Sequence, residues 1–322
     1  MPVDTKKAIY LCGGLGNQLF QVARGLSILS PGDELECLYE SSLTRTLQDD
    51  LPEISMYKFE PKVVFKKTQT SLIRQKIVNF GIRISTGNSV LARKKGVSRL
   101  ARIGIEQLLT CTLKTKLKTT IADNTGYCDD IRVGKNELFI GYSQSFHYAE
   151  ELKKPENLAK IKLKTISEKA EKLISSARNV KPIIMHVRLG DYVSEPNFGL
   201  LSSSYFLEAL NLPVLKERNC QVWIFSNDSE SAQHLLKLTD EARCLLINDQ
   251  GLTSSEVLEV MRNGSAYILS NSTFGWWGAF LSYTKDAPVV VPKKWFKKYP
   301  TPSSIYPPEW ITFAPQNELF QE

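Results

Sequence analysis

The segment Ile183–Asp191, which reads IIMHVRLGD, decides the fold. Its first five residues form a short, mostly apolar run, as in a strand that is buried on both faces of a sheet. Four similar runs follow, at Val222–Phe225, Cys244–Ile247, Ala266–Leu269 and Val289–Val291. Helix-like segments alternate with these runs, around 203–212, 229–238, 254–263 and 273–283. This alternation predicts a parallel sheet that is covered by helices on both faces.

The chain opens on another strand, loop and helix. Lys7–Cys12 has the composition of a short buried strand, GGLGNQ at 13–18 follows it, and apolar residues then recur at helical spacing up to Leu26. A later stretch of alternating lysine and glutamate ends at a predicted hinge, Asn179–Pro182. We therefore predict two α/β domains that face each other across a cleft, an N-terminal domain over 1–178 and a C-terminal domain over 179–322.

Polar residues gather at the ends of three strands predicted in the C-terminal domain. They occupy His186–Asp191, Ser226–Ser229 and Ser270–Phe274. Open α/β sheets bind ligands at the carboxyl ends of their strands, so these three segments should converge on one crevice.

Several of these polar residues have both a structural and a functional interpretation. Asn271, Ser272 and Thr273 stand where a helix should begin, and such residues either cap its N–H groups or offer them to a phosphate. The permanently charged fork of Arg188 suits a diphosphate, whereas the alternative is a surface ion pair. In GGLGNQ, a simple tight turn would explain the glycines but not the Asn-Gln pair that follows them.

The sequence lacks the signatures of several other classes of protein. Its six cysteines form no C-x-x-C pair, its three histidines are dispersed, and it contains no Asp-x-Asp, Walker loop or G-x-S-x-G motif. We therefore expect no metal site and no cofactor. The sequence shows neither a signal peptide nor a run of 18 apolar residues, so we expect a cytoplasmic protein.

The net charge of +7 is concentrated in a basic tract from Pro61 to Lys118, where 14 lysines and arginines accompany one acidic residue, Glu106. This tract is either a solvated basic face, a surface for anionic lipid or a site for a phosphate-bearing substrate. No nucleic-acid-binding motif accompanies it, so nucleic acid is not an expected partner. Reversible association with the inner face of a membrane through 61–118 is the functional prediction.

Four segments occur in an order that resembles the motif set of the α-1,2-fucosyltransferases of glycosyltransferase family 11. They are GGLGNQLFQ from Gly13, HVRLGDY from His186, FSNDS from Phe225 and SNSTFGWWGAFLS from Ser270. VVVPKKWF, from Val289 to Phe296, is similar to the closing motif of that family. The resemblance implies a GT-B-like fold with two Rossmann-like domains. It also implies inverting, metal-independent transfer of L-fucose from GDP-fucose to the 2-hydroxyl of a terminal galactoside, in O-antigen-type glycan synthesis.

The resemblance also implies roles for individual residues. Arg188 would bind the donor phosphates, Ser272 and Thr273 would hold the β-phosphate, and His186 and Asp228 would lie near the guanine. The predicted donor site further includes Asn227, Asn271 and Phe274, while Gly14, Gly16 and Asn17 would close over the donor from the other domain. Leu189 departs from the family pattern, because it replaces a second arginine.

The general base and the acceptor are not determined by these motifs. Asp191 is a candidate base, but a carboxylate three residues from Arg188 could equally hold that arginine in place. The acceptor is expected to be a galactose-terminated glycan, which could be lipid-linked, on the side of the N-terminal domain. The alternatives are a fucosyltransferase of another linkage and a non-catalytic nucleotide- or glycan-binding protein.

Overall fold

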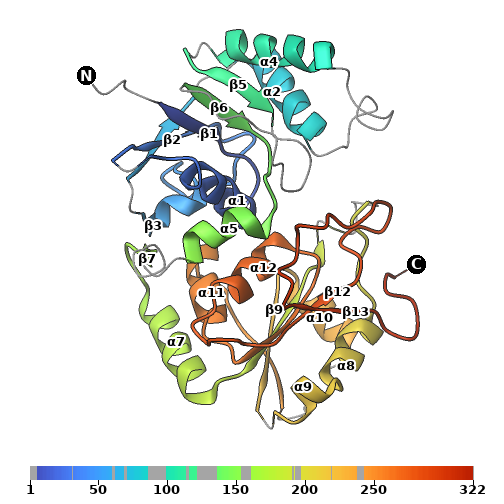
Figure 1. Ribbon diagram of the computed structural model, residues 1–322. Helices are drawn as coiled ribbons and strands as arrows, with labels where there is room; N and C mark the ends of the chain where they lie inside the picture. Colours follow the sequence, from blue (N-terminus) through green and yellow to red (C-terminus); the bar gives the residue numbers. More distant parts are fainter. Residues whose placement is uncertain are drawn as a thin grey trace. The chain divides into compact units, whose positions relative to one another are not determined.

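The computed structural model describes residues 6–30, 32–59, 62–68, 71–85, 99–113, 116–121, 136–153, 161–190, 192, 197–218, 220–237 and 243–321. The chain forms two compact units (Figure 1). The first comprises Met1–Lys164 and Ser303–Tyr306, and the second comprises Thr165–Pro302 and Pro307–Glu322. Each unit is built on a parallel sheet, which confirms the predicted α/β, GT-B-like class.

The two units divide between Lys164 and Thr165, before the predicted boundary at 178/179. Helix α7 (Glu168–Val180) belongs to the second unit because it packs against α11 (Ser254–Met261). In addition, the backbone N–H of Ser167, just before α7, donates to Glu256 Oε1 on α11 at 2.7 Å. The alternating lysines and glutamates of this stretch did not indicate the packing, because only three residues of α7 are buried, namely Ala170, Ile174 and Ala177.

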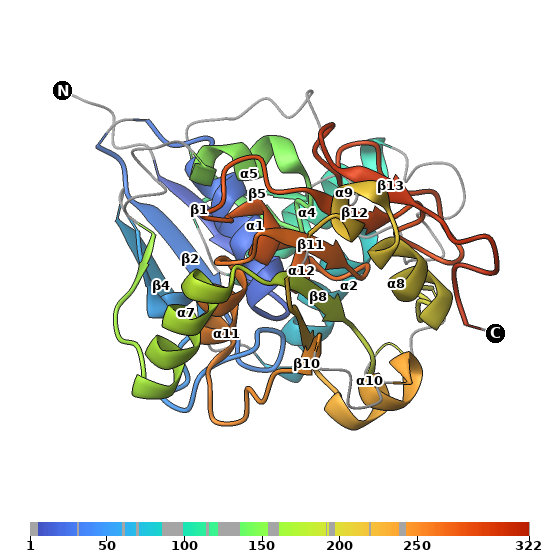
Figure 2. The same cartoon turned by 90° about the horizontal axis from the view of Figure 1, so that it is seen from below.

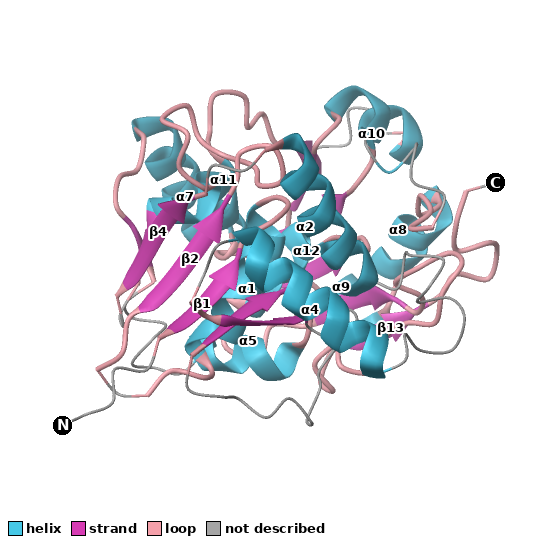
Figure 3. Cartoon of the chain, turned by 90° about the horizontal axis from the view of Figure 1, so that it is seen from above, coloured by secondary structure: helices cyan, strands magenta, loops and turns pink. Residues whose placement is uncertain are grey.

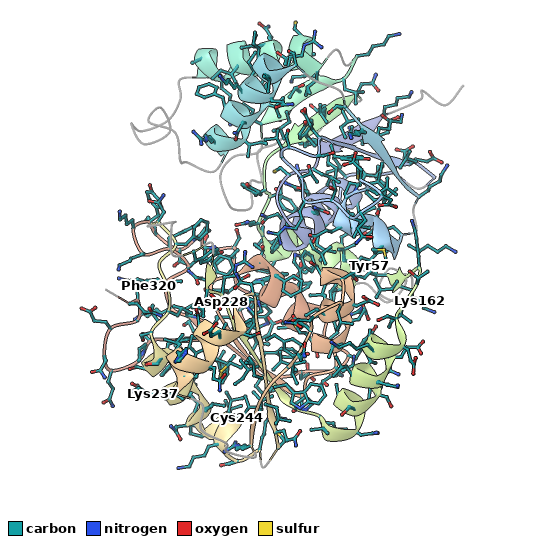
Figure 4. The ribbon with its side chains drawn as sticks, turned by 180° about the vertical axis from the view of Figure 1, so that it is seen from behind. Tyr57, Lys162, Asp228, Lys237, Cys244 and Phe320 are labelled. Atoms are coloured by element: carbon teal, nitrogen blue, oxygen red, sulfur yellow. The ribbon has the colours of Figure 1, made fainter. Side chains whose placement is uncertain are left out.

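The sheet of the first unit has the strand order β4-β2-β1-β6-β5, and all its neighbouring strands are parallel. The strands are β1 (Lys7–Tyr10), β2 (Leu35–Tyr39), β4 (Val63–Lys67), β5 (Lys118–Ile121) and β6 (Glu137–Ile140). The helices are α1 (Leu15–Leu26), α2 (Leu72–Ser85), α4 (Arg99–Leu113) and α5 (Phe146–Lys153), with a short 3-10 helix η1 (Glu53–Met56). A separate antiparallel pair joins β3 (Tyr57–Lys58) to β7 (Lys162–Leu163), and Figure 4 labels Tyr57 and Lys162.

Alternate residues of β1 point to opposite faces of this sheet. Ala8 and Tyr10 pack into a core with Val78 of α2 and Leu109 of α4. Ile9 lies on the α1 side, since a Cβ added to Gly25 of α1 would stand 3.2 Å from its Cγ2 atom. The two-residue alternation of a strand thus assigns α2 and α4 to one face and α1 to the other (Figure 3).

The sheet of the second unit has the order β10-β9-β8-β11-β12-β13 and is parallel throughout (Figure 2). Its strands are β8 (Ile183–Val187), β9 (Val222–Ser226), β10 (Cys244–Leu246), β11 (Ala266–Leu269), β12 (Val289–Pro292) and β13 (Ile311–Phe313). The first five match the predicted apolar runs to within one residue at each end. The remaining helices are α8 (Ser203–Leu210), α9 (Pro213–Lys216), α10 (Ser229–Leu236) and α12 (Thr273–Phe280).

Strand β8 is the point at which the strand order of the second unit reverses. The chain continues from β8 to β9 and β10 on one side, and β11, β12 and β13 lie on the other. Ligands of open α/β sheets bind at such a switch point, beyond the carboxyl ends of the strands. No helix in the described part of the chain is long and apolar enough to cross a bilayer.

Candidate functional site

The three polar segments of the second unit emerge at the same edge of its sheet. His186 in β8 is in register with Phe225 in β9 and with Leu269 in β11. The strands are parallel, so the residues that follow them leave the sheet side by side. The predicted convergence of these three strand ends is confirmed.

The loop after β8 is held by the side-chain amide of Asn227. Asn227 Oδ1 accepts the backbone N–H of Leu189 at 2.9 Å, and Asn227 Nδ2 donates to the carbonyl of Leu189 at 3.3 Å. Gly190 has a φ of +56°, and a Cβ at this position would lie 2.5 Å from Asn227 Nδ2. Asn227 was predicted in the donor site, and the structure shows that its amide positions the backbone next to Arg188.

Leu189 occupies the position at which the family resemblance implies a second arginine. Its side chain is 4% exposed and packs in the core of the second unit with Met185, Val187 and Leu201. A guanidinium in this orientation would be desolvated without a counter-charge, at a cost of several kcal/mol. Leu189 therefore contributes to the core, and Arg188 is the arginine that this loop offers to a ligand.

Arg188 is half-buried, and its guanidinium carbon lies 5.3 Å from the centroid of the Tyr192 ring. This distance is within the range of a cation–π interaction. The hydroxyl of Tyr192 donates to the carbonyl of Asn271 at 3.0 Å, so the ring that contacts Arg188 is tied to the segment after β11. Asp191, the candidate base, lies outside the described residues.

His186 is buried beneath the first turn of α12. Its Nδ1 atom is 2.9 Å from Ser270 Oγ, and its ring centroid is 5.8 Å from that of Phe274. A Cβ at Gly275 would lie 2.7 Å from His186 Cγ, so the helix approaches the ring through a glycine. Burial, and secondarily the charge of Arg188, lower the pKa of His186 from 6.5 to about 3. His186 is therefore neutral near pH 7.

Asn271 fixes two loops to the start of this helix. Its side chain is buried, and Nδ2 donates to the carbonyls of Phe198 at 3.1 Å and Trp295 at 3.0 Å. The amide nitrogen is thus committed to the protein backbone. Like Asn227, Asn271 lies where the donor site was predicted but makes positioning contacts there.

The N-terminus of α12 differs from those of the other helices of the second unit that have eight or more residues. At the start of α7, α8, α10 and α11, the side chain of the N-cap residue accepts a backbone N–H group of the first turn. These N-cap residues are, in order, Ser167, Ser202, Asp228 and Thr253. Ser272, at the N-cap of α12, makes no such hydrogen bond, and the first turn carries no acidic residue. Thr273 and Phe274 in that turn are half-buried. This helix end has the polarity that attracts an anion.

Asp228 follows β9 and forms the N-cap of α10 (Figure 4). Its Oδ1 atom accepts the backbone N–H of Ser231 at 3.0 Å, and Oδ2 accepts the hydroxyl of the same residue at 2.8 Å. These hydrogen bonds, the backbone one first, lower the pKa of the Asp228 carboxyl. Each carboxylate oxygen has a further lone pair, so the group can still accept donors from a ligand.

In the first unit, the glycine segment forms the turn between β1 and α1. Gly13 has a φ of +75°, and a Cβ there would lie 2.6 Å from Asn17 Nδ2. Gly14 is the N-cap of α1, and Gly16 is buried within its first turn. Asn17 is half-buried, and its Oδ1 atom accepts from Gln144 Nε2 at 2.9 Å.

Two residues that stabilise this turn were missed by sequence reasoning. The buried amide of Gln18 donates to the carbonyls of Gly13 and Arg45, both at 2.9 Å, and accepts the N–H of Ile54 at 2.9 Å. Glu53 Oε2 accepts the N–H of Leu15 at 2.8 Å and so caps α1. The Asn-Gln pair after the glycines indicated that Gln18 has a role in this segment, whereas no local sequence pattern indicated a role for Glu53.

Among the described residues, no group of three or more His, Cys, Asp or Glu side chains is arranged to hold a metal ion.

Comparison with known proteins gives matches over most of the chain. Residues 101–314 match the family model described as Glycosyl transferase family 11. The chain is 26% identical over 303 residues to an alpha-1,2-colitosyltransferase from Escherichia coli, covering 89% of this chain and 91% of the relative. It is 25% identical over 310 residues to the O-antigen biosynthesis glycosyltransferase WbnK from Escherichia coli, covering 89% and 93%. A glycosyl transferase family 9 structure from Veillonella parvula DSM 2008 superimposes with a TM-score of 0.49 at 12% identity, covering 97% of this chain and 87% of that one.

Proposed function

The chain belongs to glycosyl transferase family 11, and from this membership we propose that it transfers L-fucose from GDP-fucose to the 2-hydroxyl of a terminal galactoside. The transfer would invert the anomeric configuration and serve the synthesis of an O-antigen-type surface glycan. A relative named as an O-antigen biosynthesis glycosyltransferase, matched over 89% of this chain, supports that setting. The site of action would be the cytoplasm or the inner face of the membrane.

The N-terminus of α12 beside the loop of Arg188 is the observation that carries this proposal. In the proposed reaction the acceptor hydroxyl attacks the anomeric carbon of fucose, and the electrons of the breaking carbon–oxygen bond pass to the β-phosphate of GDP. Negative charge thus grows on the departing diphosphate. Arg188 and the N–H groups around Ser272 and Thr273 would stabilise this charge without a metal ion.

The nucleotide would lie along the ends of β8 and β9. The ionised carboxylate of Asp228 suits the N1–H and amino group of guanine, since both are donors. Neutral His186 would support the first turn of α12 from below rather than carry charge. The proton of the acceptor hydroxyl requires an acceptor, for which Asp191 remains our candidate. The roles of Gly14, Gly16 and Asn17 towards the donor, and of the first unit towards the acceptor, also stay predictions.

GDP-colitose is a second candidate donor. It is suggested by the relative named alpha-1,2-colitosyltransferase, which is 26% identical to this chain. Colitose differs from L-fucose by the loss of one hydroxyl group. The phosphate and guanine contacts proposed above would therefore serve either donor.

A donor and acceptor screen tests the proposed function. Purified protein is incubated with GDP-fucose or GDP-colitose and a terminal β-galactoside, and the product linkage is determined by NMR. Fucose on O2 of galactose, with inversion and with loss of activity in Arg188→Ala, is the expected result. Fucose on another hydroxyl would replace the proposed linkage, and colitose transfer alone would replace the proposed donor. Binding of GDP-fucose without turnover on any acceptor would identify a non-catalytic binding protein.

A further inference from the structure

Helices α2 and α4 bury one side each in the core of the first unit. Val78 and Ile82 of α2 and Leu109 of α4 are at most 5% exposed. The helices also pack closely on each other, since a Cβ at Gly81 would lie 2.9 Å from Leu109 Cδ1 (Figure 3). These contacts fix which residues of the two helices point outward.

The outward sides of both helices are unusually apolar. Leu72 and Ile73 of α2 are 75% and 72% exposed, and Phe80 is 38% exposed. On α4, Ile103 and Leu108 are 41% and 49% exposed. These five residues are the α2–α4 surface. They are five of the twelve large hydrophobic side chains that are exposed in the described part of the chain. Their concentration on two packed helices marks an interaction surface rather than scattered apolar residues.

Basic residues lie on the same outward stripe of α2. Lys76 and Arg83 are exposed, and with Ile73 and Phe80 they follow one another at intervals of three or four residues. Residues at these intervals share one side of a helix. Helix α2 contains no acidic residue. Apolar and cationic side chains therefore alternate along one exposed face.

Several basic residues of the tract form ion pairs with acidic side chains. Next to and within β4, Lys62 pairs with Glu34 at 2.8 Å, Lys66 with Glu36 and Lys67 with Asp50. On α4, Arg102 pairs with Glu106 at 3.2 Å. Arg93, Lys94 and Lys95 lie outside the described residues. Exposed apolar side chains stand beside exposed cationic ones on α2, and α4 adds the exposed apolar residues Ile103 and Leu108.

We propose that the α2–α4 surface binds the interface of an anionic lipid bilayer. Leu72, Ile73 and Phe80 would enter the boundary between headgroups and acyl chains, while Lys76 and Arg83 would remain with the lipid phosphates. Lys76 and Arg83 supply the complementary charge at this surface, within a tract that holds 14 basic residues and one acidic residue between 61 and 118.

Nucleic acid is a poorer occupant of this surface. The exposed residues of α4 include Ala101, Ile103, Gly104, Leu108 and Cys111, none of which is charged. The phosphate backbone of a nucleic acid would contact the cationic side chains only. A bilayer interface would contact both the cationic and the apolar side chains. The inference goes beyond the proposed sugar transfer and does not depend on it, because lipid binding can be measured without either substrate.

Co-sedimentation of the full chain with vesicles tests the proposal. One set of vesicles contains phosphatidylcholine alone and the other contains phosphatidylglycerol as well. Wild-type protein should sediment with the anionic vesicles at low salt and be released at high salt, because the headgroup contacts are screened. Failure to bind either set, or equal binding to both, would overturn the proposal.

Two double variants separate the apolar and cationic contributions. Leu72→Ser with Ile73→Ser should weaken partition to anionic vesicles by about tenfold or more, because two largely exposed side chains lose their buried area in the bilayer. Lys76→Gln with Arg83→Gln should weaken it several-fold and reduce the salt dependence. The matched control is Leu207→Ser with Val214→Ser, which removes apolar side chains that are 42% and 38% exposed in the second unit.

The control should bind vesicles like wild type, and all three variants should retain the wild-type rate on a water-soluble acceptor. If Leu72→Ser with Ile73→Ser bound vesicles as strongly as the wild type, the α2–α4 surface would be excluded as the lipid-binding site. If DNA rather than vesicles retained the wild-type chain, and the glutamine variant abolished that binding, the surface would be a nucleic-acid site and the proposal would be wrong.

Discussion

Asn227 holds the backbone of Leu189 through both ends of its side-chain amide, at 2.9 Å from the N–H and 3.3 Å from the carbonyl. The two residues come from the ends of neighbouring strands, β9 and β8. Leu189 directly follows Arg188 and anchors its own side chain in the core. The position of the Arg188 guanidinium thus depends on a hydrogen-bonded pair of loops and on a buried leucine.

The first prediction concerns this amide. Asn227→Ala should lower kcat by about tenfold to a hundredfold, since misplacing a catalytic group costs that much, and lower the free energy of unfolding by about 1 kcal/mol. Asn227→Asp, which can still accept from Leu189 but cannot donate, should be intermediate. Steady-state kinetics and urea unfolding measure both effects. An increase in the KM for GDP-fucose alone, with unchanged kcat and stability, would instead assign Asn227 to direct donor binding.

Arg188 itself should be essential for turnover but not for folding. Arg188→Ala removes a charged donor from the place where we propose that negative charge develops, which should cost on the order of 3–4 kcal/mol in activation free energy, or about 10²–10³ in rate. Arg188→Lys should also be poor, because an ammonium cannot reproduce the planar fork. The comparison uses single-turnover rates of folded protein, as judged by circular dichroism. A near-wild-type rate in Arg188→Ala would refute the donor-phosphate role.

The parts of the fold that sequence predicted are those set by local patterns. Strand β8 is a short apolar run bounded by Pro182 and Gly190, and its polar end could be assigned to the site because parallel strands share a carboxyl edge. The contacts that hold the site together were not predictable. Asn227 and Leu189 are 38 residues apart, as are Glu53 and Leu15, so their pairing depends on tertiary structure. The assignment of α7 to the second unit was also not predictable, because the helix has too few buried residues to show which core it packs against.

Chelation should leave the activity unchanged. The proposed charge stabilisation comes from Arg188 and from the helix end at Ser272 and Thr273, and the sequence has no Asp-x-Asp motif. Initial rates in EDTA should therefore equal those in Mg²⁺ or Mn²⁺ within about twofold, since the diphosphate of the proposed donor would already have cationic and N–H partners. A rate that falls in EDTA and returns on addition of either ion would show that a metal shares this role.

His186 should make the stability of the protein sensitive to acid. Its pKa in the folded state, about 3, lies below the ordinary value of 6.5, so the unfolded chain binds the proton first as the pH falls. The stabilisation is fully present above about pH 6.5 and is lost progressively towards pH 3. Between these values the wild type should lose up to about 1.4 kcal/mol per pH unit more than His186→Gln. The exposed His234→Gln is the control and should follow the wild type in urea unfolding at each pH.

The last prediction contrasts two glycines that differ in the space around them. Gly275→Ala would place a Cβ 2.7 Å from the ring of buried His186, which cannot move without disturbing its contact with Ser270. This overpacking should lower the free energy of unfolding by about 1–3 kcal/mol and displace the first turn of α12, so that sugar transfer also falls. Gly104→Ala, in α4, meets no atom within 4 Å and should raise stability by about 0.5–1 kcal/mol through helix propensity, without a change in rate. Equal effects of the two substitutions on stability and rate would show that α12 does not rest on His186.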